Sequence, residues 1–421
     1  MTSKTDSLVI ILISMLICTT SVSAQNSTAS PYSMFGVGQL VQREDASAAG
    51  MGHTGIAIAP NEWINISNPA AINNLDSTTF YINFQMKAFY AREESEMEHS
   101  SVSRANIDGI AMAFRAKKWW GIALGYTPYS TVGYNIDEPR TVYGDGSEYI
   151  VKYEGSGGLS RAYLNNAFSF WKKHISIGAS AGVLWGTFTN KESAFFSGSL
   201  NGENIYNTRK YTCNNLFMEY GIQFHFNIGE NNFRFGATFN DKKSMKSSYR
   251  QVVSNDISSQ LFLEEKIATR DEFAVPRSYG FGFAYTRNKF LVTADYKYSY
   301  WSKVPSSKYK ESISYQDNWS IGGGIQYSPG KREDPFYKRM RYRLGYFYST
   351  ENMLIHQTDF DEYGVTAGIT IPLGRWNNSI VVAYEHLNRG TLDNGFIKET
   401  YKIFKISFNI RETWFLKSKF E

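Results

Sequence analysis

The feature that most constrains this chain is a side-chain alternation with a period of two residues, which recurs from residue 78 onward. Residues 363–373 alternate apolar with small side chains, and residues 175–185 and 290–301 repeat the pattern. A period of two is typical of β-strands whose two faces meet different surroundings. The chain is therefore expected to be all-β, although alternation alone does not separate a soluble sandwich from a membrane barrel.

Three further features favour the barrel. Aromatic residues gather towards strand ends, as at Trp119 and Tyr300, which suits the interfacial belts of a membrane barrel. The less apolar strand faces carry charges such as Asp295 and Lys297, which a dry sandwich core does not tolerate unpaired. Short turns alternate with long polar loops, which are expected at residues 242–276, 302–317 and 350–361 among others. Together these features predict a bacterial outer-membrane β-barrel of about 14 antiparallel strands over residues 78–410.

The N-terminus has the features of an export signal. Residues 1–24 contain a short polar start, an apolar run over residues 8–17 and small residues before an expected cleavage site after Ala24. Lipidation of Cys18 is not expected, because the bulky Ile17 precedes it. The predicted location is the outer membrane of a Gram-negative bacterium, after removal of this signal peptide.

Residues 25–77 do not follow the strand pattern. The segment is rich in Gly and Ala, yet it also contains apolar residues such as Met51, Trp63 and Ile66, which favour packing over a disordered tail. Glycine permits positive φ and close approach of two backbones. The segment is therefore predicted to fold as an N-terminal plug, or hatch, inside the barrel, and residues 411–421 are predicted to form a C-terminal tail.

Two motifs in this segment, at residues 50–59 and 66–72, resemble the hatch of the long-chain fatty-acid transporter (FadL-like) family, which includes aromatic-hydrocarbon transporters. The resemblance implies a hatch-filled barrel of 14 strands, with the chain as a divergent subgroup. It also implies that hatch contacts and gating involve Gly50, Gly52, Gly55, Asn68, Pro69 and Ala70. A simpler interpretation of the Asn-Pro-Ala motif is a tight turn that ends the plug.

The same resemblance implies a lateral opening at the third strand, predicted at residues 119–128. Gly121, Gly125 and Pro128 permit a kink there, because proline removes a ladder donor. The alternative, which we favour slightly from the sequence, is a regular strand that ends at Pro128.

The expected function is uptake of hydrophobic small molecules, fatty acids or aromatic compounds, by hatch-gated lateral release. The alternative is a non-transporting accessory subunit of a protein-secretion or barrel-assembly complex. Expected partners are outer-membrane lipids, a hydrophobic small-molecule ligand and envelope proteins. The charge balance, 44 basic against 39 acidic residues, gives no reason to expect nucleic acid.

No enzyme is expected, and no catalytic residue is assigned. His174 and Ser176 share a strand face, as a hydrolase nucleophile and its base would, but no third member is identifiable. The remaining histidines lack metal-ligand spacing, so neither a metal nor another cofactor is expected. The sequence does not identify the residues that would bind a substrate.

Overall fold

The computed structural model describes residues 30–96, 98–142, 148–196, 204–255, 261–304, 313–330, 334–355, 358–373 and 378–413. The expected signal peptide and residues 414–421 of the expected tail lie outside the described residues. Among the helices in the described ranges, none combines the length and the apolar character that crossing a membrane would require.

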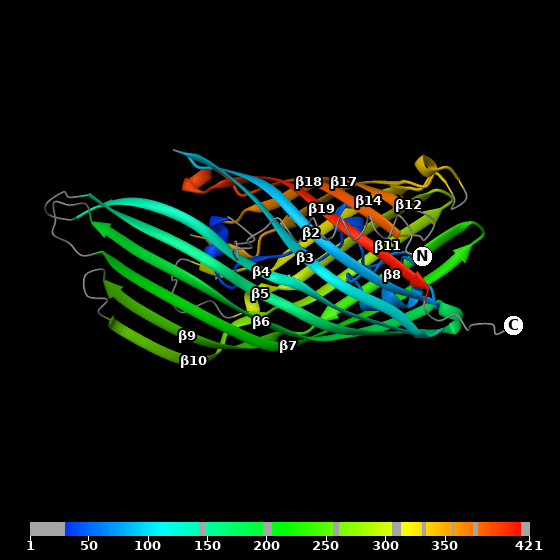
Figure 1. The fold of residues 1–421 in the computed structure, drawn as a ribbon, viewed down its shortest axis with the longest axis horizontal. Helices are drawn as coiled ribbons and strands as arrows, with labels where there is room; N and C mark the ends of the chain where they lie inside the picture. The colour runs from blue at the N-terminus through cyan, green and yellow to red at the C-terminus, as the bar shows by residue number, and fades with distance from the viewer. Residues whose placement is uncertain are drawn as a thin grey trace, which may run out of the picture.

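Fourteen antiparallel strands form a closed barrel, as the alternation predicted (Figure 1). The first and last strands, β2 and β19, pair from Thr79↔Thr413 to Glu94↔Lys398 and close the wall. The wall consists of β2 (Thr79–Glu94), β3 (His99–Lys117), β4 (Trp120–Thr141), β5 (Glu148–Phe170), β6 (Ile175–Phe196), β7 (Ile205–Ile228), β8 (Asn231–Asn240), β11 (Arg277–Arg287), β12 (Phe290–Tyr300), β14 (Asn318–Tyr327), β15 (Arg341–Thr350), β17 (Asp361–Leu373), β18 (Asn378–Arg389) and β19 (Lys398–Thr413).

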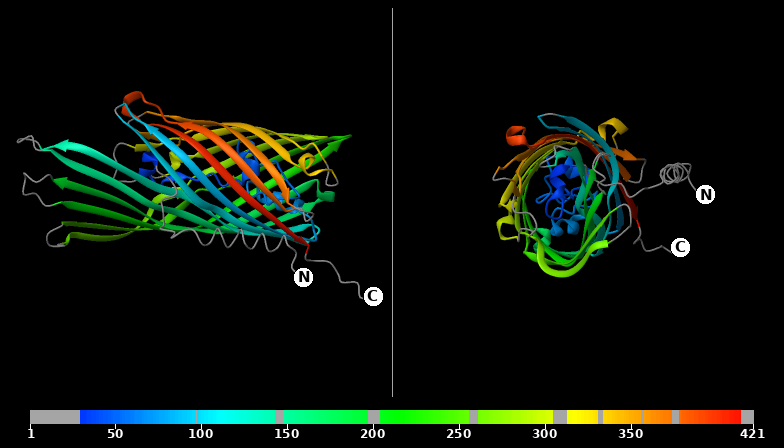
Figure 2. Two further views of the ribbon diagram at one scale, coloured as in Figure 1. Left: turned by 45° about the horizontal axis from the view of Figure 1, so that its top comes forward. Right: turned by 90° about the vertical axis from the view of Figure 1, so that its left-hand side faces the viewer.

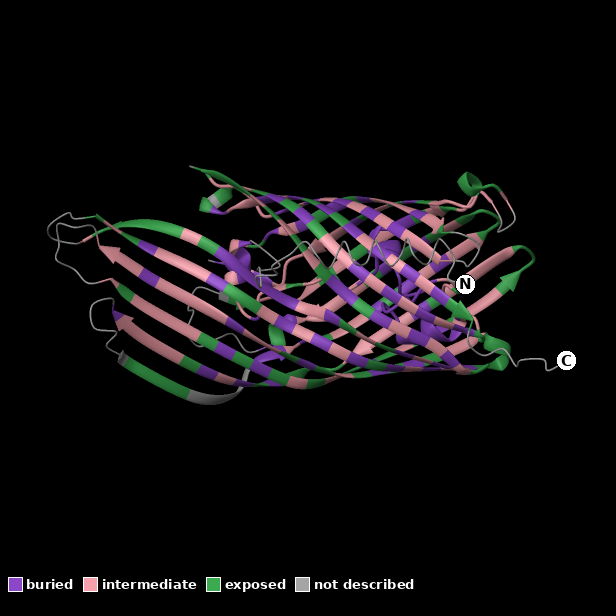
Figure 3. Ribbon diagram, in the orientation of Figure 1, coloured by how far each residue is buried: buried purple, intermediate pink, exposed green. Residues whose placement is uncertain are grey.

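The burial pattern along the strands is that of a barrel in lipid. In β7, the apolar residues Leu216, Met218 and Ile222 are 65%, 50% and 46% exposed, whereas Glu219 and Gln223, on the opposite face of the strand, are buried. Figure 3 shows the resulting alternation of buried and exposed bands along the strands. Apolar side chains that face outward and polar side chains that face the lumen are characteristic of outer-membrane barrels.

The outer part of the wall contains a hairpin where the sequence predicted a loop. Residues 242–276 form β9 (Lys243–Asn255) and β10 (Leu261–Val275), and β9 pairs with the outer half of β7. Strands β4 to β7 together with this hairpin extend past the rest of the barrel, at the left of Figure 1. The prediction was wrong because the outward positions of β9 carry charged residues such as Lys246 and Arg250, so the lipid-facing apolar signature is missing.

Two other expected loops contain short strands. β13 (Ile313–Tyr315) lies in the predicted loop 302–317 and pairs with β16 (Met353–Ile355) in the predicted loop 350–361. The helices are short: α2 (Ala46–Ala49) and the 3-10 turns η1 (Pro31–Met34), η2 (Pro69–Asn74), η3 (Trp171–Lys173), η4 (Trp301–Lys303), η5 (Phe336–Lys338) and η6 (Asp393–Gly395).

Residues 30–76, here called the luminal segment, lie inside the barrel, where Figure 2 shows them encircled by the wall. The segment contains η1, β1 (Gln39–Leu40), α2 and η2. Its apolar side chains are shielded from solvent: Ile56, Ile64, Ile72 and Leu75 are at most 1% exposed. The luminal segment therefore packs against the inner wall along much of its length.

Candidate functional site

The contact between the luminal segment and the wall is made possible by glycines on the inner face of the strands. At seven wall glycines, which are named at the end of this paragraph, an added Cβ atom would come within 3.0 Å of the luminal segment. Several are cross-strand neighbours, for example Gly236 with Gly282 and Gly324 with Gly345. We call this set the glycine band: Gly178, Gly221, Gly236, Gly282, Gly322, Gly324 and Gly345.

The predicted Asn-Pro-Ala motif lies against the glycine band. Asn68 caps η2 by accepting a hydrogen bond from the backbone N–H of Ala70 at 3.0 Å. Its Nδ2 also donates to the backbone oxygens of Ile56 at 2.8 Å and of Ile222 in β7 at 3.2 Å. The Pro69 carbonyl accepts from Asn165 Nδ2 in β5 at 3.1 Å. Asn68 Nδ2 also lies within hydrogen-bond distance of the Ala237 carbonyl oxygen in β8, at 3.4 Å. The motif is thus both a helix cap and a wall contact, and its hydrogen bonds to the wall go to β5, β7 and β8.

The three predicted hatch glycines also lie at the wall. Gly50 approaches Gly368 of β17, and Gly52, at φ +66°, donates its backbone N–H to Thr366 Oγ1 at 2.9 Å. Gly55 donates its backbone N–H to Asp295. Because a side chain at Gly52 would collide with the backbones of β14 and β15 and would strain a left-handed conformation, only glycine fits there.

The third barrel strand, β4, does not end at Pro128 as we had favoured from the sequence. It continues to Thr141, with a bulge between Pro128 and Ser130. Its ladder with β3 stops at the pair Ile110↔Tyr126, and the edge beyond is taken by β1 of the luminal segment, with Leu40 opposite Ser130. The wall is therefore interrupted between β3 and β4, and β1 pairs with the β4 edge at the interruption.

Two of the glycines predicted in this strand have close neighbours. A Cβ atom built at Gly121 would lie 3.1 Å from Ile72 of the luminal segment, and one built at Gly125 would collide with the hydroxyl of Tyr163. The irregularity in this strand is the bulge after Pro128, where the ladder has already changed partner.

Charged groups form a second layer of attachment. Glu44 is 2% exposed and accepts from Lys297 Nζ at 2.6 Å. Lys405 donates to the Gln42 carbonyl at 3.1 Å, and His53 Nε2 lies 3.3 Å from Glu385. Buried charges are tolerated only when they are paired, and these pairs hold the luminal segment to β12, β18 and β19.

The charge of Glu44 makes this attachment sensitive to acid. Burial raises the pKa of Glu44, but the positive charges of Lys297 and His53 together with the other contacts lower it by more than burial raises it. The pKa therefore lies below its ordinary value of 4.5. A depressed pKa in the folded state means that the stabilisation is present above about pH 4.5 and is lost as the pH falls towards the folded-state pKa.

Asp295 of β12 holds the luminal segment most directly. Its Oδ2 accepts the backbone N–H groups of Gly55 at 2.7 Å and of Ile56 at 2.9 Å, and Asp295 itself is 4% exposed. Replacing Asp295 with Ala leaves both donors buried without an acceptor. We expect a loss of about 2 to 4 kcal/mol of attachment energy, since hydrogen bonds to charged groups contribute about 1.5–3 kcal/mol each and are not additive.

This loss is measurable as faster proteolysis of the luminal segment in the folded, detergent-solubilised barrel. Asp241→Ala, at an exposed residue of the neighbouring β8–β9 junction, is the matched control. Equal proteolysis rates for the two variants would contradict the role assigned to Asp295.

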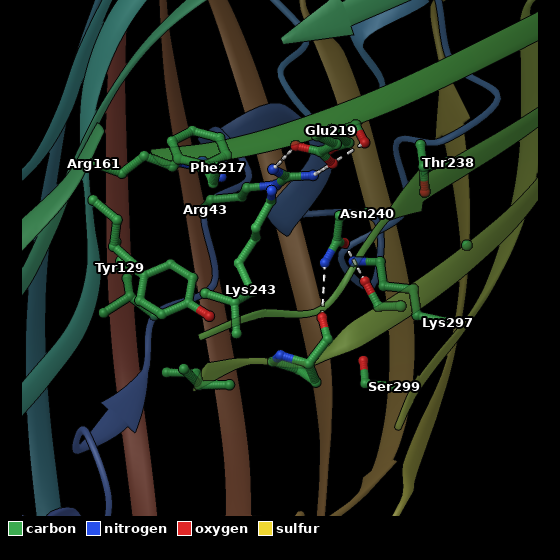
Figure 4. A pocket seen from close by; sticks show the side chains of 18 of the residues that line it. Arg43, Tyr129, Arg161, Phe217, Glu219, Thr238, Asn240, Lys243, Lys297 and Ser299 are labelled. Atoms are coloured by element: carbon green, nitrogen blue, oxygen red, sulfur yellow. Dashed lines mark hydrogen bonds and ion pairs between the residues drawn. The ribbon is translucent and has the colours of Figure 1, made fainter. Parts of the chain in front are cut away.

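A cavity of about 280 Å³ remains between the luminal segment and the wall (Figure 4). Its lining combines apolar side chains, such as Phe217 and Leu184, with charged ones, among them Arg43, Arg161 and Glu219. A smaller cavity of about 70 Å³ lies on the other side of residues 39–42 and is also lined by charged groups.

The pair considered for a hydrolase does not form a catalytic arrangement in the described part of the chain. His174 Nδ1 contacts the carbonyl oxygen of His225 at 2.9 Å, and the two histidine rings stack with centroids 5.1 Å apart. No hydrogen bond joins His174 to Ser176 among the described residues. His174 instead contacts His225 and so helps to hold the start of β6 against β7.

Comparison with known proteins identifies the chain's relatives. A family model described as BamG matches residues 7–421. The chain belongs to the BamG family. Among curated protein sequences, no match to this BamG-family chain was found.

Solved structures share the fold of this BamG-family barrel. A Pseudomonas aeruginosa FadL homologue has a TM-score of 0.60 at 11% identity, over 90% of this chain and 99% of its own. The Pseudomonas putida toluene transporter TodX has a TM-score of 0.59 at 14% identity, over 89% and 99%. The Ralstonia pickettii toluene transporter TbuX gives 0.58 at 14%, over 87% and 98%. The resemblance to the FadL-like family is thereby confirmed at the level of the fold, and these neighbours are transporters rather than enzymes.

Proposed function

We propose that this BamG-family barrel is a closed, non-enzymatic subunit of an envelope protein complex in the outer membrane. The observation that carries the proposal is the glycine band, whose members admit the backbone of the luminal segment at distances that leave no room for a side chain. A hatch that must move is expected to rest on exchangeable side-chain contacts, whereas close backbone packing on several strands resists displacement.

The chemistry of the interior supports the same proposal. A hydrophobic solute that crossed the lumen would pass the buried charges of Glu44, Glu385 and Lys405 and the half-buried charge of Lys297. Such a solute offers these groups no hydrogen bonds, so its passage would carry a desolvation penalty. Membership of the BamG family also directs attention to partners in the cell envelope.

Uptake of hydrophobic small molecules is the second candidate, and one specific observation favours it. The wall interruption between β3 and β4 lies beside the 280 Å³ cavity, which Leu40 and Pro128 help to line. Release through this gap would require β1 to leave the edge of β4, with Gly50, Gly52, Gly55 and residues 68–70 as the contacts that yield. The toluene transporters among the structural neighbours make this candidate reasonable.

Under either candidate we propose that residues 1–24 are removed on export, that residues 25–77 form the hatch, and that residues 78–410 form the membrane barrel followed by a short tail.

Gentle detergent extraction of the native protein, followed by mass spectrometry, tests the proposal. We expect a stoichiometric set of envelope proteins and no apolar ligand in the lumen. Recovery of the barrel alone with bound hydrophobic molecules would overturn the subunit proposal in favour of uptake. Extraction after mild cross-linking is the control that retains weakly bound partners.

A further inference from the structure

The charges that line the 280 Å³ cavity do not balance. Its lining contains four cations and three carboxylates, namely Arg43, Arg161, Lys243, Lys297, Glu44, Glu219 and Asp241. Every one of these carboxylates already has a basic partner. The pairs are Glu219 with Arg43, Glu44 with Lys297, and Asp241 with Arg277, which is not part of the lining. Two cations, Arg161 and Lys243, are therefore left facing the cavity.

Arg161 is a buried cation that forms no direct ion pair within the described part of the chain, because the nearby Glu219 is already paired with Arg43. It is 8% exposed, and no carboxylate among the described residues lies within ion-pair distance of its guanidinium. Among the described residues, its guanidinium donates one side-chain hydrogen bond, to Thr127 Oγ1 at 3.3 Å, and Nε has no hydrogen-bond partner. The guanidinium lies 5.2 Å from the ring centroid of Phe217 and 5.6 Å from that of Tyr163. Stacking on these rings fixes the plane of the guanidinium and leaves N–H groups available at its edge.

Lys243 supplies the second cation at the mouth of the cavity. It is exposed at the start of β9, beside the exposed Asp241, so the cavity opens at the junction of β8 and β9. Figure 4 shows the side chain of Lys243 directed into the cavity, towards Arg43 and Glu219. An exposed cation at the mouth and a buried one in the wall therefore line the same cavity.

We propose that this cavity binds a phosphate group, with Arg161 as the fixed contact and Lys243 as the contact at the entrance. A buried guanidinium without a counter-ion is costly, and an anionic ligand would relieve that cost. Two unbalanced cations match a group that carries nearly two negative charges, and the planar fork of arginine suits phosphate oxygens. Asn240 and Ser299 add polar groups to the lining. The phosphate belongs either to a lipid headgroup or to a small soluble molecule. The inference stands independently of the function proposed above.

Calorimetric titration of the detergent-solubilised, phosphate-free protein tests the site. The probes are inorganic phosphate, short-chain phosphatidic acid and octanoate, which carries one charge. We expect binding of at least one phosphate probe, weakened at least tenfold in Arg161→Met and at least threefold in Lys243→Met. Lys242→Met is the matched control, because Lys242 is exposed next in sequence but does not line the cavity.

The two phosphate probes separate the sources of the ligand. Binding of both assigns the site to the phosphate group alone, and binding of phosphatidic acid only assigns it to lipid headgroups. Lys243 is exposed, so its variant remains informative if the Arg161 variant does not fold. Unchanged affinities in Lys243→Met, no binding of either phosphate probe, or octanoate binding as tightly as phosphate would overturn the proposal.

Discussion

Replacing Gly324 with valine is expected to detach the luminal segment from the wall, whereas the same change at Gly323 is expected to leave it in place. The two glycines are neighbours in β14 and face opposite sides. A Cβ at Gly324 would meet Met51 within 3.0 Å, including its backbone, but the nearest atom to a Cβ at Gly323 is 3.9 Å away. Overpacking of this kind costs about 1–3 kcal/mol.

The change is read out by maleimide labelling of a cysteine placed at Ala70, which is 1% exposed, in a Cys213→Ser background. A destabilisation of one to two kcal/mol shifts the attached and detached populations by about 5- to 30-fold. We therefore expect labelling at least fivefold faster in Gly324→Val than in Gly323→Val. Heat-modified mobility on gels confirms that both barrels are folded. Equal labelling in the two variants would show that the glycine band does not hold the segment.

The barrel was predictable because lipid imposes a clear pattern on the strands that cross it. Residues 363–373 keep an apolar face outward along their length, and β17 (Asp361–Leu373) is found there. The pattern weakens where strands leave the membrane. Strand β4 continues past Pro128 to Thr141, and β9 forms where a loop was expected. These segments were missed because a strand whose outer face meets water needs no apolar residues there and can carry Lys or Arg instead.

The contacts of the luminal segment were only partly predictable. Gly52 and Asn68 were recognisable as hatch residues from their motifs, and both contact the wall. Asp295 and Lys297 were recognisable as charges on the lumen-facing side of a strand. The residues of the luminal segment that contact them were not recognisable. The alternation shows that a side chain faces the lumen, but it does not show which residue of another segment lies opposite that side chain. The glycine band was missed for a related reason: its members are cross-strand neighbours only once the register of the strands is known.

Deletion of residues 31–76 is expected to convert the closed barrel into a conducting pore. The segment fills most of the interior, and the ladder between β19 and β2 closes the wall without it, although β1 covers the gap between β3 and β4. Without the segment, the inward-facing charges of Asp295, Lys297 and Lys405 would line a hydrated lumen, as polar side chains do in porins. In planar bilayers the full-length protein should show no steady conductance, and the deletion variant should show one that persists at low voltage.

Two variants decide how to interpret that pore. Asp295→Ala removes an anchor but leaves the segment tethered, so the closed subunit proposed here predicts rare, brief openings at most. A hatch built for transport predicts frequent openings in the same variant, because its remaining contacts must already be weak enough to exchange. Gly323→Val, on the outer face of the wall, should conduct no more than the unmodified protein. A folded deletion variant that stays closed would mean that the wall itself collapses inward, and the luminal segment would then be a scaffold for the barrel rather than its seal.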